Sequence, residues 1–290
     1  MKSLPPGRIV SALLLLTPLT ASAQNFVDLD FSHNVQATNA FYPNNSTLGP
    51  AYFAGLTLDF ENVAFVNGLA VDARVTLNYA GGNPISPGYE FVGYIPDYNT
   101  AGTNPGNDLG VYYRSINGYS SSPYTGGVSY TITFYESGSN YTTKQTLSNF
   151  RFLVYDHDGE EDQSETVRTF ASDGFVGYQI GKNSGITTRD SNGIWDFDAR
   201  GSNHPETTAD GGFIAYYENT SSVRFDMYAT TSPNLPWANN GVFAAFDGDL
   251  SVTGGSTNDF YSYQPIPEPA TSLLAVGAVA LAMLRRTRQG

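Results

Sequence analysis

The chain has 290 residues, a formal net charge of −13, no cysteine, and aromatic side chains at 14% of its positions. Without cysteine it has no disulfide and no thiolate metal site, and its acidic balance disfavours nucleic acid or anionic lipid as a partner. The 20 Tyr, 18 Phe, 30 Gly and 16 Pro favour strands and turns over helices, so an all-β protein is expected.

The first 23 residues have the three-part order of a secretory signal peptide. Lys2 and Arg8 precede an apolar stretch over residues 9–19, and the small residues Ala-Ser-Ala end at Ala23. Because signal peptidase requires this basic, apolar and small-residue order, export and cleavage after Ala23 are expected. Residues 1–23 are therefore excluded from the predicted fold.

Period-two alternation of apolar and polar residues recurs from residue 24 to residue 254. Turn clusters rich in Gly, Pro and Asn separate about a dozen short strand candidates. We predict a single antiparallel β-sandwich or jelly-roll-like domain over residues 24–254, with residues 255–266 as a linker. The clearest inward-facing sets are Val71, Ala73, Val75, Leu77 and Tyr79; Tyr130, Ile132 and Phe134; and Val223, Phe225 and Met227.

An acidic turn follows the strand candidate that ends at Tyr155. Oxygen ligands at alternate positions, with Gly159 to bend the chain, suit Ca²⁺ at about 2.3–2.6 Å, although the spacing is not that of an EF-hand. A solvated acidic hairpin turn is the alternative. The candidate calcium ligands are Asp156, Asp158, Glu160, Asp162 and Glu165, with Asp247 and Asp249 as a weaker pair.

The same turn contains a Glu-x-Asp-x-x-Glu motif at Glu160, Asp162 and Glu165. This motif resembles the catalytic signature of the jelly-roll laminarinase-type glycoside hydrolases. The resemblance implies two carboxylates about 5–5.5 Å apart that carry out retaining hydrolysis. That family places the motif on a strand with apolar residues between the acids, whereas here the intervening residues are polar. Hydrolysis is therefore the weakest of the functions considered.

Two further carboxylate pairs are spaced to share one face of a strand. Asp28 with Asp30, and Asp196 with Asp198, are separated by two positions. An alternating strand with one solvated face has this pattern, so polar outer faces are the favoured interpretation, and ligands of the same or a second metal site are the alternative.

The three histidines, His33, His157 and His204, are far apart in the sequence, and nothing in it supports a zinc site. The carboxylates near His157 are expected to raise its pKa, and His157 is read as a turn residue rather than a catalytic base.

Aromatic residues near turns are candidate sugar platforms. Trp237 and Trp195 are the two tryptophans, and the flat face of an indole ring can stack on a sugar ring. The alternative is that most aromatic side chains in so aromatic a chain fill the core.

The C-terminal segment has three parts. Pro267, Glu268 and Pro269 precede an apolar stretch over residues 270–284, and an arginine cluster follows. Fifteen helical residues span roughly 22 Å, short of the ~30 Å hydrocarbon core, so the predicted transmembrane helix is thin. Arginine side chains can extend to the headgroups on the cytoplasmic side. The arginines of the tail are Arg285, Arg286 and Arg288.

Together these parts resemble the PEP-CTERM sorting signal over residues 267–290. The resemblance implies processing by an exosortase, a membrane-embedded cysteine protease or transpeptidase that cuts near the Pro-Glu-Pro box. It also implies transient insertion into the inner membrane and delivery to the cell surface or extracellular matrix of a bacterium that makes exopolysaccharide. An ordinary tail anchor is the alternative.

These features predict an exported cell-surface or extracellular protein that is a non-enzymatic structural or adhesive component of an exopolysaccharide or biofilm matrix. Its expected partners are signal peptidase, the exosortase and exopolysaccharide, with no nucleic acid and with calcium at the acidic turn as the one candidate cofactor. The alternatives are a carbohydrate-binding, lectin-like module and a jelly-roll glycoside hydrolase.

Overall fold

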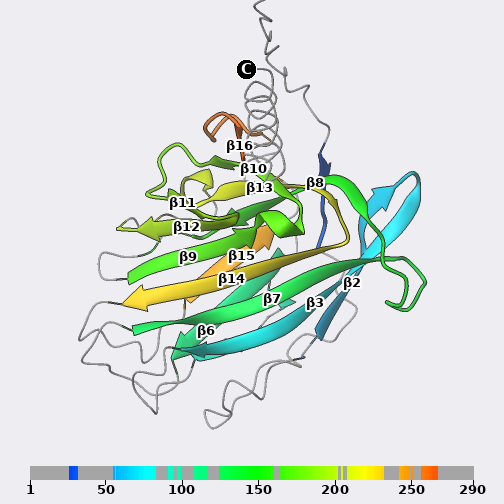
Figure 1. Ribbon diagram of the computed structural model, residues 1–290, viewed down its shortest axis with the longest axis horizontal. Coiled ribbons are helices and arrows are strands. Elements are labelled where there is room, and N and C mark those ends of the chain that lie inside the picture. The colour runs from blue at the N-terminus through cyan, green and yellow to red at the C-terminus, as the bar shows by residue number, and fades with distance from the viewer. Residues whose placement is uncertain are drawn as a thin grey trace, which may run out of the picture.

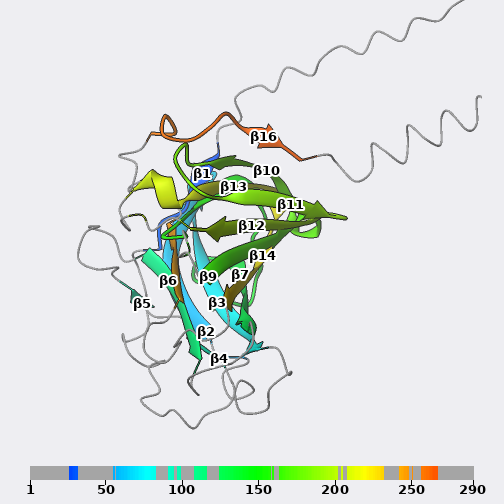
Figure 2. The same ribbon diagram turned by 90° about the vertical axis from the view of Figure 1, so that its left-hand side faces the viewer.

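The computed structural model describes residues 26–31, 55, 57–82, 91–94, 97–98, 108–115, 124–157, 159, 163–201, 204, 208–231, 242–247, 250 and 256–266. Their strands form two sheets that lie against each other, as Figure 1 and Figure 2 show from two directions. The expectation of an all-β protein with two layers is confirmed for this part of the chain.

The first sheet contains nine of the described strands. Its order is β16-β10-β13-β8-β15-β6-β4, with β1 beside β8 and β5 beside β6. The pair of β1 with β8 is parallel. The bounds are β1 Val27–Asp28, β4 Phe91–Tyr94, β5 Asp97–Tyr98, β6 Asp108–Ser115, β8 Leu147–Tyr155, β10 Phe175–Ile180, β13 Phe213–Thr220, β15 Val242–Asp247 and β16 Gln264–Pro265.

The second sheet has seven described strands in the order β11-β12-β9-β14-β7-β3-β2, and each neighbouring pair is antiparallel. Two short 3₁₀ turns, η2 (Ala171–Asp173) and η3 (Ala209–Gly211), lie in the connections. The bounds are β2 Thr57–Val66, β3 Leu69–Gly82, β7 Tyr124–Glu136, β9 Gln163–Phe170, β11 Thr187–Ser191, β12 Ile194–Arg200 and β14 Ser222–Thr231.

From β7 to β15 the chain changes sheet at each connection except the β11–β12 hairpin. Each connection therefore crosses the edge of the sandwich and brings residues near in sequence to opposite sides of the core. The turn from β8 to β9 is one of these crossings, and it carries the acidic residues that the sequence singled out.

The main core lies between the two sheets and is rich in aromatic rings. The predicted inward-facing residues Val75, Ile132 and Phe225 are each 0% exposed, which confirms the period-two interpretation for these strands. The rings of Phe197 and Phe213 stack across the core with centroids 3.9 Å apart. Alternation predicted these faces because successive side chains of a strand point to opposite sides of the sheet.

Two hairpins of the seven-stranded sheet use the same turn chemistry. Asn67 and Gly68 join β2 to β3 with φ of 52° and 81°, and Asn192 and Gly193 join β11 to β12 with φ of 55° and 84°. Two consecutive positive φ angles define the type I′ turn, whose twist matches that of the strands, and Asn-Gly is its preferred sequence.

Residues 256–266, which we call the C-terminal strap, fold onto the outer face of the nine-stranded sheet beside β10 (Figure 2). Phe260 is 3% exposed, and the Tyr263 ring meets that of Tyr216 with centroids 5.2 Å apart. The backbone N–H of Ile266 donates to Val176 O at 2.9 Å. This differs from the predicted linker over residues 255–266, because a second apolar cluster outside the main core holds the segment.

The two ends of the chain lie outside the described residues. These ends include residues 1–23 and Ala23, the Pro267, Glu268 and Pro269 box, the expected helix over residues 270–284, and Arg285, Arg286 and Arg288. Within the described ranges, no helix has the length and apolarity to cross a membrane. The expected signal peptide and sorting signal remain predictions.

Candidate functional site

The acidic turn crosses from β8 to β9 at the edge of the sandwich. Asp156 has φ of 55° and Gly159 has φ of 61°, so the chain bends at both positions. The bend expected at Gly159 is confirmed, and Gly tolerates the left-handed region at no steric cost. Asp158, Glu160 and Asp162 lie outside the described residues.

The described ends of this turn face inward rather than to solvent. His157 is 1% exposed, its backbone N–H donates to Gly211 O at 2.8 Å, and its Nε2 lies 2.9 Å from Phe197 O. Glu165 is 6% exposed and lies on the core-facing side of β9, in line with the buried Val167. His157 Nδ1 and Glu165 Oε2 are 3.8 Å apart.

The expectation that nearby carboxylates raise the pKa of His157 is wrong. Burial lowers the pKa of His157 to about 4, although the backbone hydrogen bond to Phe197 acts in the opposite direction. Removing the charged imidazolium from water costs more than the hydrogen bond to Phe197 O returns. His157 is therefore neutral at physiological pH.

The buried position of Glu165 bears on the glycosidase motif. A carboxylate that acts on a polysaccharide must reach the chain in an open cleft, whereas Glu165 points between the sheets beside His157. Glu160 and Asp162, the other two members of the motif, are outside the described residues.

For the calcium prediction, the described residues hold no group of three or more Asp, Glu or His side chains that could bind a metal ion. Asp247 is described through its backbone in β15, and Asp249 lies outside the described residues. Calcium binding at the acidic turn stays a prediction.

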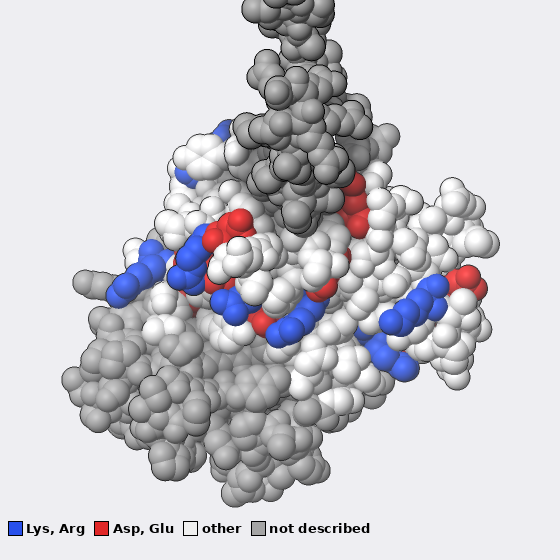
Figure 3. Space-filling view, viewed as in Figure 1, with Lys and Arg blue, Asp and Glu red and all other residues white. Residues whose placement is uncertain are grey.

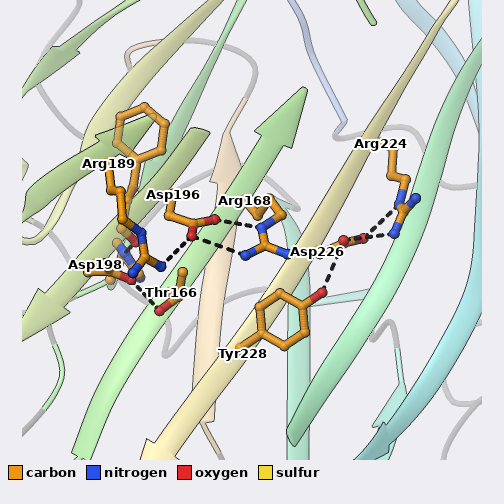
Figure 4. A network of polar contacts seen from close by, with 10 residues as sticks. Thr166, Arg168, Arg189, Asp196, Asp198, Arg224, Asp226 and Tyr228 are labelled. Carbon is orange, nitrogen blue, oxygen red and sulfur yellow. Dashed lines mark hydrogen bonds and ion pairs between the residues drawn. The ribbon is translucent and has the colours of Figure 1, made fainter. Parts of the chain in front are cut away.

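Charged side chains from four neighbouring strands form a row on the outer face of the seven-stranded sheet (Figure 4). Arg189 of β11, Asp196 of β12, Arg168 of β9 and Asp226 of β14 are successive cross-strand partners, and we call them the charged row. Arg168 Nε and Nη2 donate to the two carboxylate oxygens of Asp196 at 2.6 and 3.0 Å. Arg189 Nη2 donates to Asp196 Oδ2 at 2.6 Å.

The row continues along β14. Arg224 Nε and Nη2 each donate to Asp226 at 2.7 Å, and the Tyr228 hydroxyl donates to Asp226 Oδ2 at 3.1 Å. The Arg224 guanidinium also lies over the Phe170 ring at 4.7 Å from its centroid. Burial, together with the charge of Asp226, raises the pKa of Tyr228 to about 12.

The arginines cover the carboxylates of the row. The side chains of Asp196 and Asp226 are 4% and 2% exposed, whereas those of Arg168 and Arg189 are 30% and 66% exposed. Burial by itself would raise the pKa of Asp196, but the hydrogen bonds from both arginines outweigh burial and lower it. In Figure 3, blue and red side chains lie next to each other in a band across this face.

The arginines and aspartates of the charged row bind one another, so the row fixes the register of the strands and does not offer a binding site. A slip of one residue would turn these charges into the core, so the row specifies how β11, β12, β9 and β14 align. Asp196 and Asp198 do share the outer face of β12, as the sequence predicts, and Thr166 Oγ1 donates to Asp198 Oδ1 at 2.5 Å. Asp28 also has a basic partner, because Arg151 Nε donates to its Oδ1 at 2.5 Å.

Of the two tryptophans, Trp195 belongs to the described residues. Trp195 is partly buried on the core-facing side of β12. The centroid of its ring lies 6.1 Å from that of Phe175 and 5.5 Å from that of Tyr178. It is therefore a packing residue at the edge of the core rather than an open sugar platform. Trp237 lies outside the described residues.

Sequence reasoning did not find the charged row or the buried His157–Glu165 contact. The alternating Arg and Asp of "VRFDMY" and "WDFDAR" signal a charged outer face, but not which strands are neighbours. His157 and Glu165 carry no such signal, because a polar residue beside a turn is expected at the surface.

No family model matches the chain, and no curated protein matches it. Among solved structures, the crystal structure of the N-terminal domain of the Streptococcus gordonii adhesin Sgo0707 resembles it with a TM-score of 0.46 and 12% sequence identity. The likeness covers 77% of this chain and 63% of that one, so the chain spans less than two thirds of the length of that domain. At this score we draw no conclusion about function from the likeness.

Proposed function

We propose that this protein is exported and sorted to the cell surface, where it is a non-enzymatic structural or adhesive domain of an extracellular polysaccharide matrix. Signal peptidase would remove residues 1–23 after Ala23, and an exosortase would process the tail at Pro267, Glu268 and Pro269. The tail motif carries this proposal, because it combines the box, an apolar stretch and an arginine cluster in the order that sorting requires.

The position of the strap supports processing of a folded domain. Ile266 packs against the core through its side chain and pairs with Val176 through its backbone, and Pro267 is the next residue. Cleavage at the box would therefore leave the described strands and the strap intact. Phe26 and Tyr263 both contact the Tyr216 ring, so the two ends of the described domain meet on one side of it.

The outer face of the seven-stranded sheet supports a structural role over a catalytic one. Its buried carboxylates at Asp196 and Asp226 are already bound by arginines from the same sheet. Carboxylates that already accept hydrogen bonds from arginines of the same sheet stabilise the alignment of the strands.

Processing at the box can be tested directly by the mass of the surface protein. The chain is expressed in a host that carries the exosortase and in the same host without it, and the intact mass is measured after surface extraction. We expect loss of the segment after the box only where the exosortase is present. Glu268→Ala should block this loss, whereas Glu136→Ala, at an exposed position on β7, should not. Equal full-length masses in all four samples would refute the sorting proposal.

A carbohydrate-binding role is the alternative function. It is tested by binding of the chain to purified exopolysaccharide, with Trp237→Ala as the variant, since the Trp195 ring is engaged in packing. Saturable binding that the variant loses would favour the lectin-like function over a purely structural one.

A further inference from the structure

The C-terminal strap is bound to β10 by its backbone up to the residue before the Pro-Glu-Pro box. The backbone N–H of Tyr261 donates to Ile180 O at 2.8 Å. The backbone N–H of Ile266 donates to Val176 O at 2.9 Å, and its side chain packs against the main core. Pro267, the first residue of the box, is the next residue in the chain. No residue therefore separates the bound strap from the box.

Buried side chains add a second set of contacts to the strap. Phe260 is 3% exposed in the apolar cluster on the outer face of the nine-stranded sheet. Gln179 donates from Nε2 to Tyr261 O at 2.7 Å and accepts a hydrogen bond from the Tyr216 hydroxyl. The Tyr263 hydroxyl donates to a backbone carbonyl of β10 at 3.0 Å. Because detaching the strap breaks these buried contacts, the bound strap is the favoured state.

The bound strap restricts the access of a protease to the box. An extended peptide binds in a cleft through its backbone N–H and C=O groups, and the N–H of Ile266 is already bonded to β10. The predicted membrane segment begins at residue 270, so the box can span at most about 10 Å between the folded domain and that segment. This distance is about the diameter of a single α-helix with its side chains. A folded enzyme therefore has no room to bind the box while the strap is closed.

We propose that the strap regulates processing, because the exosortase can cleave near the box only while the strap is detached from β10. This inference rests on the proposed sorting. Opening a short segment at a sheet edge costs less free energy than unfolding the domain. Cleavage of a transiently open state follows the population of that state, so the stability of the strap sets the processing rate. After cleavage the strap can close again, because the contacts described above involve residues up to Ile266.

The test measures how fast the precursor is shortened, by pulse-chase labelling and intact mass, in the host that carries the exosortase. Phe260→Ala removes a ring from the apolar cluster, and Gln179→Ala removes the donor to Tyr261 O. Each substitution should raise the processing rate at least tenfold, because each increases the population of the open strap. Glu136→Ala, at an exposed position on β7 in the other sheet, is the matched control and should be processed at the parent rate.

A flexible spacer tests whether access is the limiting step. Insertion of about eight Gly and Ser residues between Ile266 and Pro267 frees the backbone before the box while the sequence of the strap is unchanged. We expect the insertion to raise the processing rate at least tenfold. In the presence of the spacer, Phe260→Ala should change the rate by less than about twofold, because the enzyme no longer depends on an open strap.

Hydrogen exchange of the full chain shows whether a variant opens the strap or unfolds the domain. The amides of Tyr261 and Ile266 should exchange at least tenfold faster in both strap variants than in the parent. The Phe134 amide, which donates to Ser221 O at 2.9 Å in the other sheet, should exchange at the parent rate. If it also exchanges faster, the spacer insertion decides, because that variant keeps every residue of the strap.

The outcomes distinguish this proposal from the sorting on which it rests. If the parent is processed but the strap variants and the spacer variant are processed no faster, the strap does not regulate cleavage. If the parent is not processed in the host that carries the exosortase, the sorting itself is refuted, and this proposal with it.

Discussion

Replacing Asp196 by Asn should lower the free energy of unfolding by about 2 kcal/mol. The substitution keeps the shape of the side chain but removes the charge that Arg168 and Arg189 share. It also places an amide NH₂ where one of the carboxylate oxygens accepted a hydrogen bond. The N–H groups of an arginine then face the NH₂ of the asparagine, with no acceptor between them, at the buried centre of the charged row.

The magnitude follows from the exposure of the two arginines. The bidentate pair with Arg168 is partly buried, and hydrogen bonds to charged groups of this kind contribute about 1.5–3 kcal/mol. The Arg189 side chain is 66% exposed, so solvent screens that pair and it adds little to the stability. Because both arginines can turn to water when the carboxylate is lost, the cost stays below the 3–5 kcal/mol of a fully buried broken pair.

The assay is urea unfolding of parent and variant at neutral pH, with Asp198→Asn as the matched control. Asp198 lies two residues along the same face of β12 and accepts a hydrogen bond from Thr166. Because an amide oxygen can accept the same hydrogen bond, the Asp198→Asn substitution should cost about 0.5 kcal/mol or less. In thermal unfolding, the Tm of the Asp196→Asn variant should be about 4–8 °C below that of the parent. A loss below 0.5 kcal/mol with an unchanged denaturant slope would refute the reasoning.

The same variant makes a prediction about pH. The folded-state pKa of Asp196 is lowered from 3.8, so its contribution is complete above the unfolded value and is lost as pH falls through the folded value. The difference in stability between parent and Asp196→Asn should therefore be constant near neutral pH and shrink below about pH 4. A difference that grows on acidification would contradict the assignment.

Three further outcomes are expected. The buried Thr169 hydroxyl lies 2.5 Å from the Tyr217 hydroxyl oxygen, so Tyr217→Phe removes its partner and should lower the free energy of unfolding by about 1–3 kcal/mol. Adding Thr169→Val should recover most of that loss, as measured by urea unfolding. Gly177→Ala places a Cβ 2.4 Å from the Tyr263 ring, so limited proteolysis should cut within the strap sooner than in the parent, and equal rates would contradict the packing. Burial raises the pKa values of Tyr228 and Tyr263 to about 12. Their contribution to the free energy of unfolding is therefore complete below pH 10 and should fall as the pH rises from 10 to 12. Near-ultraviolet absorbance and circular dichroism can follow ionisation and unfolding together.

Local patterns in the sequence sufficed for the strands and their faces. The alternation that buries Tyr130, Ile132 and Phe134 depends only on the period of two in a strand. The Asn-Gly turns at Asn67 and Asn192 likewise follow from backbone preferences of two adjacent residues. Neither feature needs knowledge of which strands become neighbours.

The packing of the strap and the pairing in the charged row are two features that local sequence patterns do not predict. "TGGSTNDFYSYQPI" is polar and rich in small residues, so it predicts a linker. In the structure, however, Phe260 and Tyr263 pack on an apolar surface to which β8, β10 and β13 contribute. The Arg and Asp residues of the outer face alternate as expected, but their pairing depends on the order β11-β12-β9-β14. That order joins segments far apart in the chain.

The sequence by itself therefore determined an all-β chain with alternating faces and Asn-Gly hairpins, because these depend on residues within one strand or turn. Only the tertiary structure decided the environment of His157 and Glu165. Their burial arises where β8 leaves one sheet and β9 enters the other, with Phe197 supplied by a third strand. The charge state of an imidazole depends on the solvent and dipoles around it, and here those come from strands whose neighbours no local pattern specifies.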